Sequence, residues 1–195
     1  YVYASNIDVG AKTADITVEA EVKNEYSTSQ SVSFEAVVVD SDGNSVMSRT
    51  FAPQSISAGQ KYTFSVTGNM TDIHLWSPEY PYMYKVYTTL KINGVAVDVY
   101  ETPLGIRTIS FNVAQGLMIN NRPTYLKGYA PRSTMEWVTV GMPPNWMREH
   151  DFKLMKESNA TFFRPMRVPY TTGRCKGFLC FRRLPIPAQP LFSHR

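Results

Sequence analysis

Apolar and polar residues alternate with a period of two along most of the first hundred residues. The run Ala14–Lys23 places every second side chain on one apolar face, and Val32–Val39 and Lys61–Val66 repeat the pattern. Strict alternation predicts strands with one buried and one solvent-facing side. The same criterion predicts further strands at residues 45–51, 82–92 and 95–100.

Asn93 and Gly94 separate the last two of these strands. A two-residue Asn-Gly connection is the strongest short hairpin signal, because both central residues need a positive φ. Short strands with regular turn spacing over about 100 residues are typical of an immunoglobulin-like β-sandwich. The sequence therefore predicts a mostly β chain with such a sandwich over residues 1–110.

The pattern changes after residue 110. Short strands are predicted at residues 106–113, 116–119 and 123–127, followed by a loop. A helix is predicted after Pro143-Pro144, because Trp146, Met147, Leu154 and Met155 recur at helical spacing. Asn159-Ala160 ends it, and residues 161–163 form a short buried strand. The order strand, loop, helix, strand predicts the opening of an α/β unit with a parallel sheet.

Residues 170–195 do not continue that order. They contain five basic residues, no acidic residue, both cysteines and closely spaced prolines that prevent a helix interior. One interpretation is that this irregular basic tail is out of frame and not native coding sequence. The other is an ordinary extended tail, and the sequence leaves both open.

Charge and composition exclude several classes of function. The net charge is +4, but without the five basic residues of the tail 15 basic residues face 16 acidic ones, which gives −1. No basic face remains, so we expect no nucleic-acid binding. A content of 43% hydrophobic and 18% charged residues indicates a globular chain, and no apolar stretch is long enough for a membrane span. Residues 1–25 show no signal peptide, while the start at Tyr1 in strand-like sequence leaves a removed signal or an upstream domain open.

Metal and cofactor chemistry finds no support in the sequence. Cys175 and Cys180 have poor spacing for zinc, and three scattered histidines form neither a metal site nor a Ser-His-Asp constellation. No glycine-rich phosphate loop occurs. We therefore expect no metal and no cofactor.

Five segments together resemble glycoside hydrolase family 2, which contains β-galactosidases, β-glucuronidases and β-mannosidases. Leu75–Tyr84 (LWSPEYPYMY) resembles the family segment LWSPENPYLY, and Gly105–Arg107 resembles GFR. Ile119–Gly128 resembles LNGKPVxLRG, Trp146–Asn159 resembles the first barrel helix, and Arg164–Pro169 resembles RxxHxP. Their order and spacing match the family over residues 75–169.

The resemblance implies a domain plan and a reaction. Residues 1–110 would be the immunoglobulin-like sandwich, and residues 111–169 the incomplete start of a (β/α)8 barrel. The family is a set of retaining glycosidases, which cleave β-glycosidic bonds of oligo- or polysaccharides with two carboxyl groups. Neither glutamate can be matched here, because the family places both on later barrel strands. We therefore expect this fragment to be inactive by itself.

The resemblance also implies candidate substrate-side residues. Arg164 aligns with the family arginine that orients the nucleophilic carboxylate, and its alternative role is a structural salt bridge. Glu136 and Trp137 lie in the loop after the first barrel strand, where they could contact the sugar or be ordinary loop residues. Arg132 matches an arginine of the family's Asn-Arg-His run, although the histidine is absent. Arg167 also departs from the family, which usually has histidine there.

The expected partner of the intact enzyme is a carbohydrate substrate. An open parallel sheet edge would favour association, so a homo-oligomer is a further candidate. The family fits a periplasmic or extracellular location. The alternative function is a non-catalytic immunoglobulin-like module that binds carbohydrate or protein, which would make the similarity at residues 119–169 a coincidence.

Overall fold

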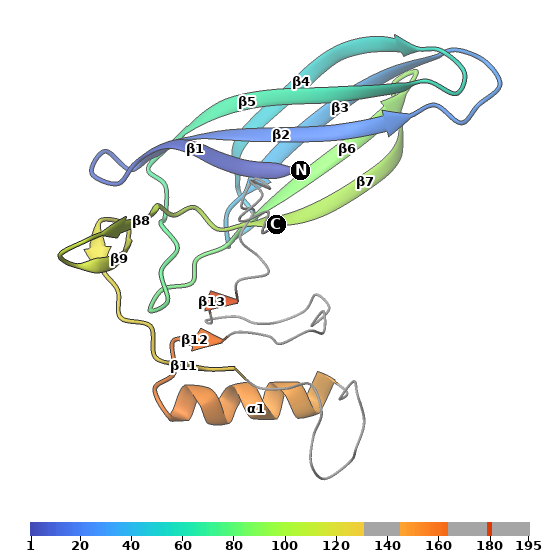
Figure 1. The fold of residues 1–195 in the computed structure, drawn as a ribbon. Coiled ribbons are helices and arrows are strands. Elements are labelled where there is room, and N and C mark those ends of the chain that lie inside the picture. Colours follow the sequence, from blue (N-terminus) through green and yellow to red (C-terminus); the bar gives the residue numbers. More distant parts are fainter. Residues whose placement is uncertain (131–144, 164–178, 181–195) are drawn as a thin grey trace, which may run out of the picture. The chain divides into compact units, whose positions relative to one another are not determined.

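The computed structural model describes residues 1–130, 145–163 and 179–180 (Figure 1). The chain forms two compact units. The first contains residues 1–77 and 82–123, and the second contains residues 78–81 and 124–195. The chain therefore passes between the units at three points, after residues 77, 81 and 123.

The first unit is built on seven antiparallel strands in two sheets. One sheet has the order β1-β2-β5 and the other β4-β3-β6-β7. The strands are β1 (Val2–Asp8), β2 (Thr13–Lys23), β3 (Gln30–Val39), β4 (Ser45–Ile56), β5 (Lys61–Thr71), β6 (Tyr84–Ile92) and β7 (Val95–Leu104). This arrangement fits the predicted immunoglobulin-like sandwich. The strands β4, β5 and β7 are longer than predicted, because the ladders continue past the clearly alternating runs.

The hairpin predicted at Asn93-Gly94 is confirmed. Asn93 has a φ of 50° and Gly94 a φ of 82°, and the flanking residues Ile92 and Val95 face each other across the ladder. Positive φ at both central positions gives the turn the twist that matches the strands on either side. This turn fixes the register of β6 on β7.

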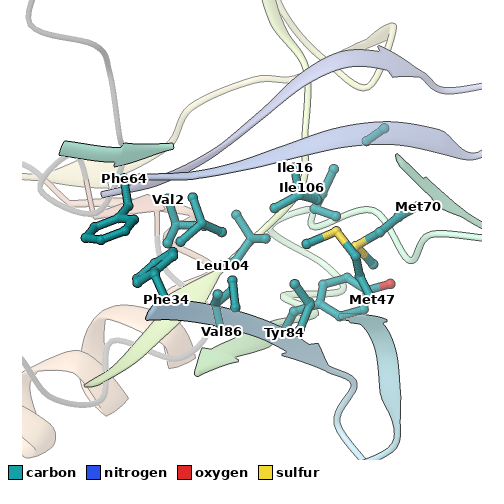
Figure 2. Packing of buried hydrophobic residues seen from close by; sticks show 14 of the residues in the cluster. Val2, Ile16, Phe34, Met47, Phe64, Met70, Tyr84, Val86, Leu104 and Ile106 are labelled. Atoms are coloured by element: carbon teal, nitrogen blue, oxygen red, sulfur yellow. The ribbon is translucent and has the colours of Figure 1, made fainter. Parts of the chain in front are cut away.

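The core lies between the two sheets and consists of the inward-facing residues of both (Figure 2). Ile16 on β2 and Phe64 on β5 face Phe34 on β3 and Val86 on β6, and all four side chains are buried. The rings of Phe34 and Phe64 stack with centroids 5.6 Å apart, and Phe51 and Phe64 meet edge to face at 5.3 Å. Both geometries are favoured for aromatic pairs.

Asn24 is a buried polar residue directly after β2. Its side-chain amide donates to the carbonyl oxygens of Ile56 at 2.8 Å and Thr28 at 2.9 Å. Its side-chain oxygen accepts from the backbone N–H of Tyr26 at 2.9 Å. The side chain thus satisfies three backbone groups that the ends of the strands leave unpaired.

Both edge strands of the four-stranded sheet contain a proline. Pro53 lies in β4, where the register shifts between Val32 and Phe34 of the neighbouring strand, and Pro103 lies in β7. Proline has no N–H to donate to a ladder, and in sheets it is therefore confined to edges, bulges and strand starts.

A small antiparallel sheet follows the sandwich in the first unit, with the order β10-β9-β8. Its strands are β8 (Ile109–Asn112), β9 (Gly116–Ile119) and β10 (Arg122–Pro123). Asn120 and Asn121, both at positive φ, form the turn into β10. The strand predicted at residues 123–127 is wrong: only Arg122 and Pro123 pair with β9, and Pro123 has no N–H with which to extend the ladder.

In the second unit three two-residue strands form a parallel sheet in the order β11-β12-β13. They are β11 (Gly128–Tyr129), β12 (Phe162–Phe163) and β13 (Leu179–Cys180), and the helix α1 (Asn145–Glu157) connects the first two. The helix, its end and the strand at 162–163 agree with the sequence prediction. The tail was expected to be irregular, but Leu179 and Cys180 lie within a short apolar run and pair with β12.

Candidate functional site

The parallel sheet of the second unit positions the segments on which the sequence predicts a site. Tyr129 at the end of β11 pairs with Phe163 at the end of β12, and Phe163 pairs with Cys180. Carboxyl ends of adjacent parallel strands meet at one edge of a sheet, which is where α/β proteins build their sites. The segments after residues 130 and 163 therefore start from neighbouring points.

Gly128 makes this close pairing sterically allowed. A Cβ atom at this position would overlap the backbone carbonyl group of Phe162 on β12. Lys127 supports the same junction, because its carbonyl oxygen accepts from the N–H groups of Thr161 at 2.7 Å and Phe162 at 3.0 Å. Glycine at position 128 is thus required by the backbone geometry of the strand pair, whereas residue 127 contributes its backbone carbonyl group.

The helix α1 ends in a left-handed cap. Asn159 has a φ of 59°, and the N–H of Ala160 donates to the carbonyl oxygen of Met155 at 3.0 Å. The Ser158 hydroxyl donates to the same carbonyl at 2.7 Å and accepts from the Tyr129 hydroxyl at 3.1 Å. The cap satisfies carbonyl groups that a helix end leaves open, and it connects the helix to β11.

One face of α1 is partly buried. Met147, Asp151 and Met155 follow each other at four-residue spacing along this face. Trp146, which belongs to the apolar spacing that predicts the helix, lies on the opposite side and is 68% exposed. The reason is the 100° step per residue of a helix, which turns Trp146 away from the face that Met147 occupies. Burial raises the pKa of the Asp151 carboxyl above its usual value.

All four predicted site residues lie outside the described residues. Arg132, Glu136 and Trp137 belong to the segment after β11, and Arg164 is the first residue after β12. Arg167 lies outside as well. Their roles remain predictions, while the strand ends from which both segments start are described.

Arg107 lies against the ring of Trp76 in the first unit. Trp76 itself is buried, with 5% of its surface exposed. The Arg107 guanidinium carbon lies 4.4 Å from the centroid of the Trp76 ring. Burial lowers the pKa of Arg107 to about 10, because the charged form loses water. The sequence contained both residues within family-like motifs, but nothing in it indicated that they meet.

A groove of about 420 Å³ opens between the two sheets of the first unit, beside β1 and β7. Its lining includes the apolar residues Val22, Phe34 and Leu90, and the acidic residues Glu19 and Asp98. The sequence does not indicate this groove, because its walls come from six strands that are distant in sequence.

Within residues 1–130, 145–163 and 179–180, no group of three His, Cys, Asp or Glu side chains could hold a metal ion. No helix in the described part of the chain has the length and apolar content that crossing a membrane requires.

The fold and the motifs agree with comparisons to known proteins. The model of glycosyl hydrolases family 2 matches residues 1–107, which is more than half of the chain. The chain therefore belongs to glycosyl hydrolases family 2.

Two curated relatives are informative. A β-glucuronidase of Formosa agariphila is 39% identical over 165 residues, which cover 84% of this chain and 16% of the relative. The β-galactosidase BoGH2A of Bacteroides ovatus is 25% identical over 169 residues, which cover 87% of this chain and 19% of the relative. The chain thus spans less than a fifth of the length of either protein.

Solved structures support the mostly β fold with its sandwich. The structure of a β-glucuronidase from glycoside hydrolase family 2 superimposes with a TM-score of 0.77 at 37% identity, over 85% of this chain and 17% of that one. The crystal structure of Bacteroides uniformis β-glucuronidase gives a TM-score of 0.78 at 22% identity, which supports the fold alone.

Proposed function

We propose that this chain supplies the sandwich and the first strands of the catalytic barrel of a retaining β-glycosidase. The observation that carries the proposal is the parallel sheet β11-β12-β13 with α1 between its first two strands, in a family 2 chain. A strand, a helix and an adjacent parallel strand are the repeating unit of a (β/α)8 barrel.

The site of such a barrel lies at the carboxyl ends of its strands. Arg164 follows β12 directly, and its rigid fork of donors would orient the carboxylate that attacks the sugar. Arg132, Glu136 and Trp137 follow β11 and would contact the sugar ring. The register of Tyr129 on Phe163 supports this assignment, because it starts both segments from adjacent strand ends.

The reaction needs two carboxyl groups about 5–5.5 Å apart. One gives its proton to the leaving oxygen as the glycosidic bond breaks, and the other bonds to the anomeric carbon. Water then attacks the glycosyl-enzyme, and the first group takes back a proton. In this proposal both groups belong to barrel strands beyond residue 169, so the chain alone does not catalyse hydrolysis.

The substrates proposed for the complete enzyme are β-glucuronides, with β-galactosides as the second candidate. The choice follows from the names of the relatives, since the most similar of those described above is a β-glucuronidase. A β-glucuronide bears a carboxylate that a cationic side chain of the enzyme would bind, whereas a β-galactoside is uncharged. Rates with the p-nitrophenyl derivatives of both sugars therefore distinguish the two candidate substrates.

The test is a chimera in which residues 1–169 replace the matching segment of the Formosa agariphila enzyme. We expect the chimera to cleave p-nitrophenyl β-glucuronide with retention, and the 195-residue chain to cleave neither substrate. Arg164→Met should lower kcat/KM of the chimera by at least about 100-fold, whereas Arg49→Met in the sandwich should not.

Circular dichroism and size-exclusion chromatography would establish that each chimera is folded before its rates are compared. Undiminished rates in the Arg164→Met chimera would contradict the assigned role. Specific binding of glycans by the 195-residue chain would favour the non-catalytic module instead.

A further inference from the structure

The strand β2 extends beyond the strand that pairs with it on one side. β1 follows β2 as far as Val18, and the carbonyl oxygen of Tyr1 accepts from the N–H of Glu19 at 2.7 Å. β2 itself continues to Lys23 and pairs with β5 up to that residue. In the part of the chain that the structure describes, no strand lies beside residues 20–23 on the β1 side. Figure 1 shows β2 running on past the point marked N, where β1 begins.

The backbone of this open edge points away from β5. Alternate residues of an antiparallel strand direct their N–H and C=O groups to opposite sides. Glu19 bonds through both groups to Tyr1 on the β1 side, whereas the N–H of Asn24 donates at 2.9 Å to the residue that precedes β5. Glu21 and Lys23 therefore turn their backbone groups to the β1 side, where none of the described residues pairs with them. Such a row of groups is a template for another strand.

The groove of about 420 Å³ lies beside this open edge. Residues 19–22 of β2 line one side of it, and the opposite side includes Thr88 and Leu90 of β6 and Asp98 and Tyr100 of β7. These two sides belong to the two sheets of the sandwich. The groove thus opens where the three-stranded sheet has no strand of the described chain to place opposite β7.

The face of β7 that borders the groove is the inward face of its sheet. Asp98 and Tyr100 share this face with Leu104, which is buried, because alternate residues of a strand lie on one side. Tyr100 is nevertheless 68% exposed. The inward face of β7 is therefore covered near Leu104 and uncovered near Tyr100, on the side of the sandwich where β2 has its open edge.

Asp98 gives the groove a negative charge beside apolar surface. No Lys or Arg is among the described residues that line the groove, and its apolar lining includes Val22 and Leu90. Glu21 is paired with Lys61 at 2.7 Å, whereas none of the ion pairs between described residues includes Asp98. A lysine or arginine side chain fits this combination, because its methylene groups pack on apolar surface while its charged end meets a carboxylate.

Other strand edges of the sandwich carry features that oppose the addition of a strand. β4 contains Pro53, β7 contains Pro103, and the pairing of β1 shifts register between Ser5 and Asp8. Prolines and bulges are the devices by which natural edge strands avoid such pairing. Residues 20–23 contain no proline and keep a regular register on β5. This edge is thus suited to accept a strand.

We propose that the end of β2 binds an extended segment of another polypeptide that places a lysine or arginine side chain in the groove. The segment runs antiparallel to β2, in line with β1, and its backbone pairs with Glu21 and Lys23. Its alternate side chains point toward β7, and the basic one reaches Asp98. Backbone pairing supplies affinity and the groove supplies the preference for a basic residue. This inference concerns the first unit alone and does not depend on the glycosidase proposed above.

The experiment is an NMR titration of the nitrogen-15-labelled 195-residue chain with three peptides at neutral pH and equal ionic strength. The first is acetyl-(Thr-Lys)3-amide, and the second is acetyl-(Thr-Glu)3-amide, which reverses the charge. The third is the lysine peptide with proline in place of its second threonine, which keeps the charge but removes one N–H. Amide hydrogen exchange is measured with and without each peptide.

The lysine peptide is expected to bind saturably and to slow exchange of the Glu21 amide by at least about tenfold, because this N–H gains a partner. Exchange at Val22, whose N–H points to β5, should change far less. The proline peptide should bind at least about fivefold more weakly through the loss of one hydrogen bond. The glutamate peptide should not bind saturably, because its charge repels Asp98.

A pair of substitutions tests the charge in the groove. Asp98→Asn should weaken binding of the lysine peptide by about threefold, as expected for an exposed ion pair. Asp42→Asn removes the same charge from an exposed acid in the turn between β3 and β4, and it should leave binding unchanged. The unsubstituted chain with the three peptides tests the pairing itself, independently of either variant.

Three results would overturn the proposal. One is the absence of a saturable response to the lysine peptide at millimolar concentration. The second is equal binding of the lysine and proline peptides, which would show attraction of charge without strand pairing. The third is protection of the Glu21 amide that rises with protein concentration before any peptide is added, because the edge would then be occupied by a second copy of the chain.

Discussion

The stacked rings of Phe34 and Phe64 join the two sheets of the sandwich. Phe34 comes from β3 and Phe64 from β5, and their planes lie 20° apart with centroids separated by 5.6 Å. Phe64 also meets Phe51 and Tyr62 edge to face. Phe64 thus contacts three other aromatic rings, from residues that lie up to thirty positions away in the sequence.

Phe64→Ala should therefore be strongly destabilising. Removing a fully buried phenylalanine ring loses its transfer free energy and leaves a cavity, which together cost about 3 to 5 kcal/mol. The free energy of unfolding is measured by urea denaturation followed by circular dichroism. Phe111→Ala is the matched control, because Phe111 is 82% exposed and its loss should change stability by less than about 0.5 kcal/mol. Equal effects of the two substitutions would contradict the packing described for the core.

Gly94→Ala should destabilise the β6–β7 hairpin through the backbone alone. No heavy atom lies within 4 Å of the position that a Cβ would occupy, so space is not the problem. The φ of 82° is unfavourable for an L-residue with a Cβ, and we expect a loss of about 1 to 2 kcal/mol. Gly10→Ala, at a glycine without positive φ, is the control and should leave the urea midpoint unchanged or slightly raised.

Asn24→Ala should cost roughly 2 to 3 kcal/mol of unfolding free energy. The substitution removes the amide from the buried carbonyl oxygen of Ile56, which keeps only the Ser29 hydroxyl at 3.3 Å, and leaves two further backbone groups without this partner. Asn112→Ala removes a single exposed hydrogen bond to the N–H of Ala114 and serves as the control. A loss at Asn24 no larger than that at Asn112 would mean that water replaces the amide.

Asp15 should contribute to stability only above acidic pH. The side-chain amides of Asn6 and Asn69 donate to its carboxylate, each at 2.9 Å, and hold its pKa below the ordinary value of 3.8. Because the unfolded chain binds the proton more readily, this contribution is present above pH 3.8 and is lost as the pH falls through the lowered pKa.

NMR titration of the Asp15 carboxyl carbon measures this directly. Asn6→Gly removes the first amide and tolerates the φ of 48° at this position, so the pKa of Asp15 should rise toward 3.8. The pKa of Asp40, which Asn44 lowers in the same way, is the internal control and should not change. A pKa of Asp15 that does not respond would contradict the role of the amide.

Much of the sandwich could be predicted because its strands bury only one face. The alternation from Ala14 to Lys23 indicates a strand, and Asn93-Gly94 indicates a tight turn. Both signals depend only on neighbouring residues, so they are visible in the sequence without knowledge of the partner strands. The lengths of β4 and β5 could not be predicted, since they depend on the partner strand. Pro53 illustrates this: it would exclude a central strand, but β4 lies at the sheet edge.

The candidate site could be predicted from the sequence only in part. The segment order that places Arg164 directly after a short strand was accessible from the sequence, because short apolar runs such as Phe162–Phe163 are visible there. The meeting of Trp76 with Arg107 was not, since thirty residues separate them and no periodicity connects them. The exposure of Trp146 was not accessible either, because apolar spacing identifies a helix but does not say which of its apolar side chains are covered.

The two prolines at the edges of the four-stranded sheet have a consequence for the chain during synthesis. Residues 1–107 leave the ribosome before residues 124–195, so the sandwich can fold while the second unit is still being made. In that interval β4 and β7 face other nascent chains. Proline is one of the residues by which natural edge strands limit pairing with another chain, and Pro53 and Pro103 place it on both edges of this sheet during that interval.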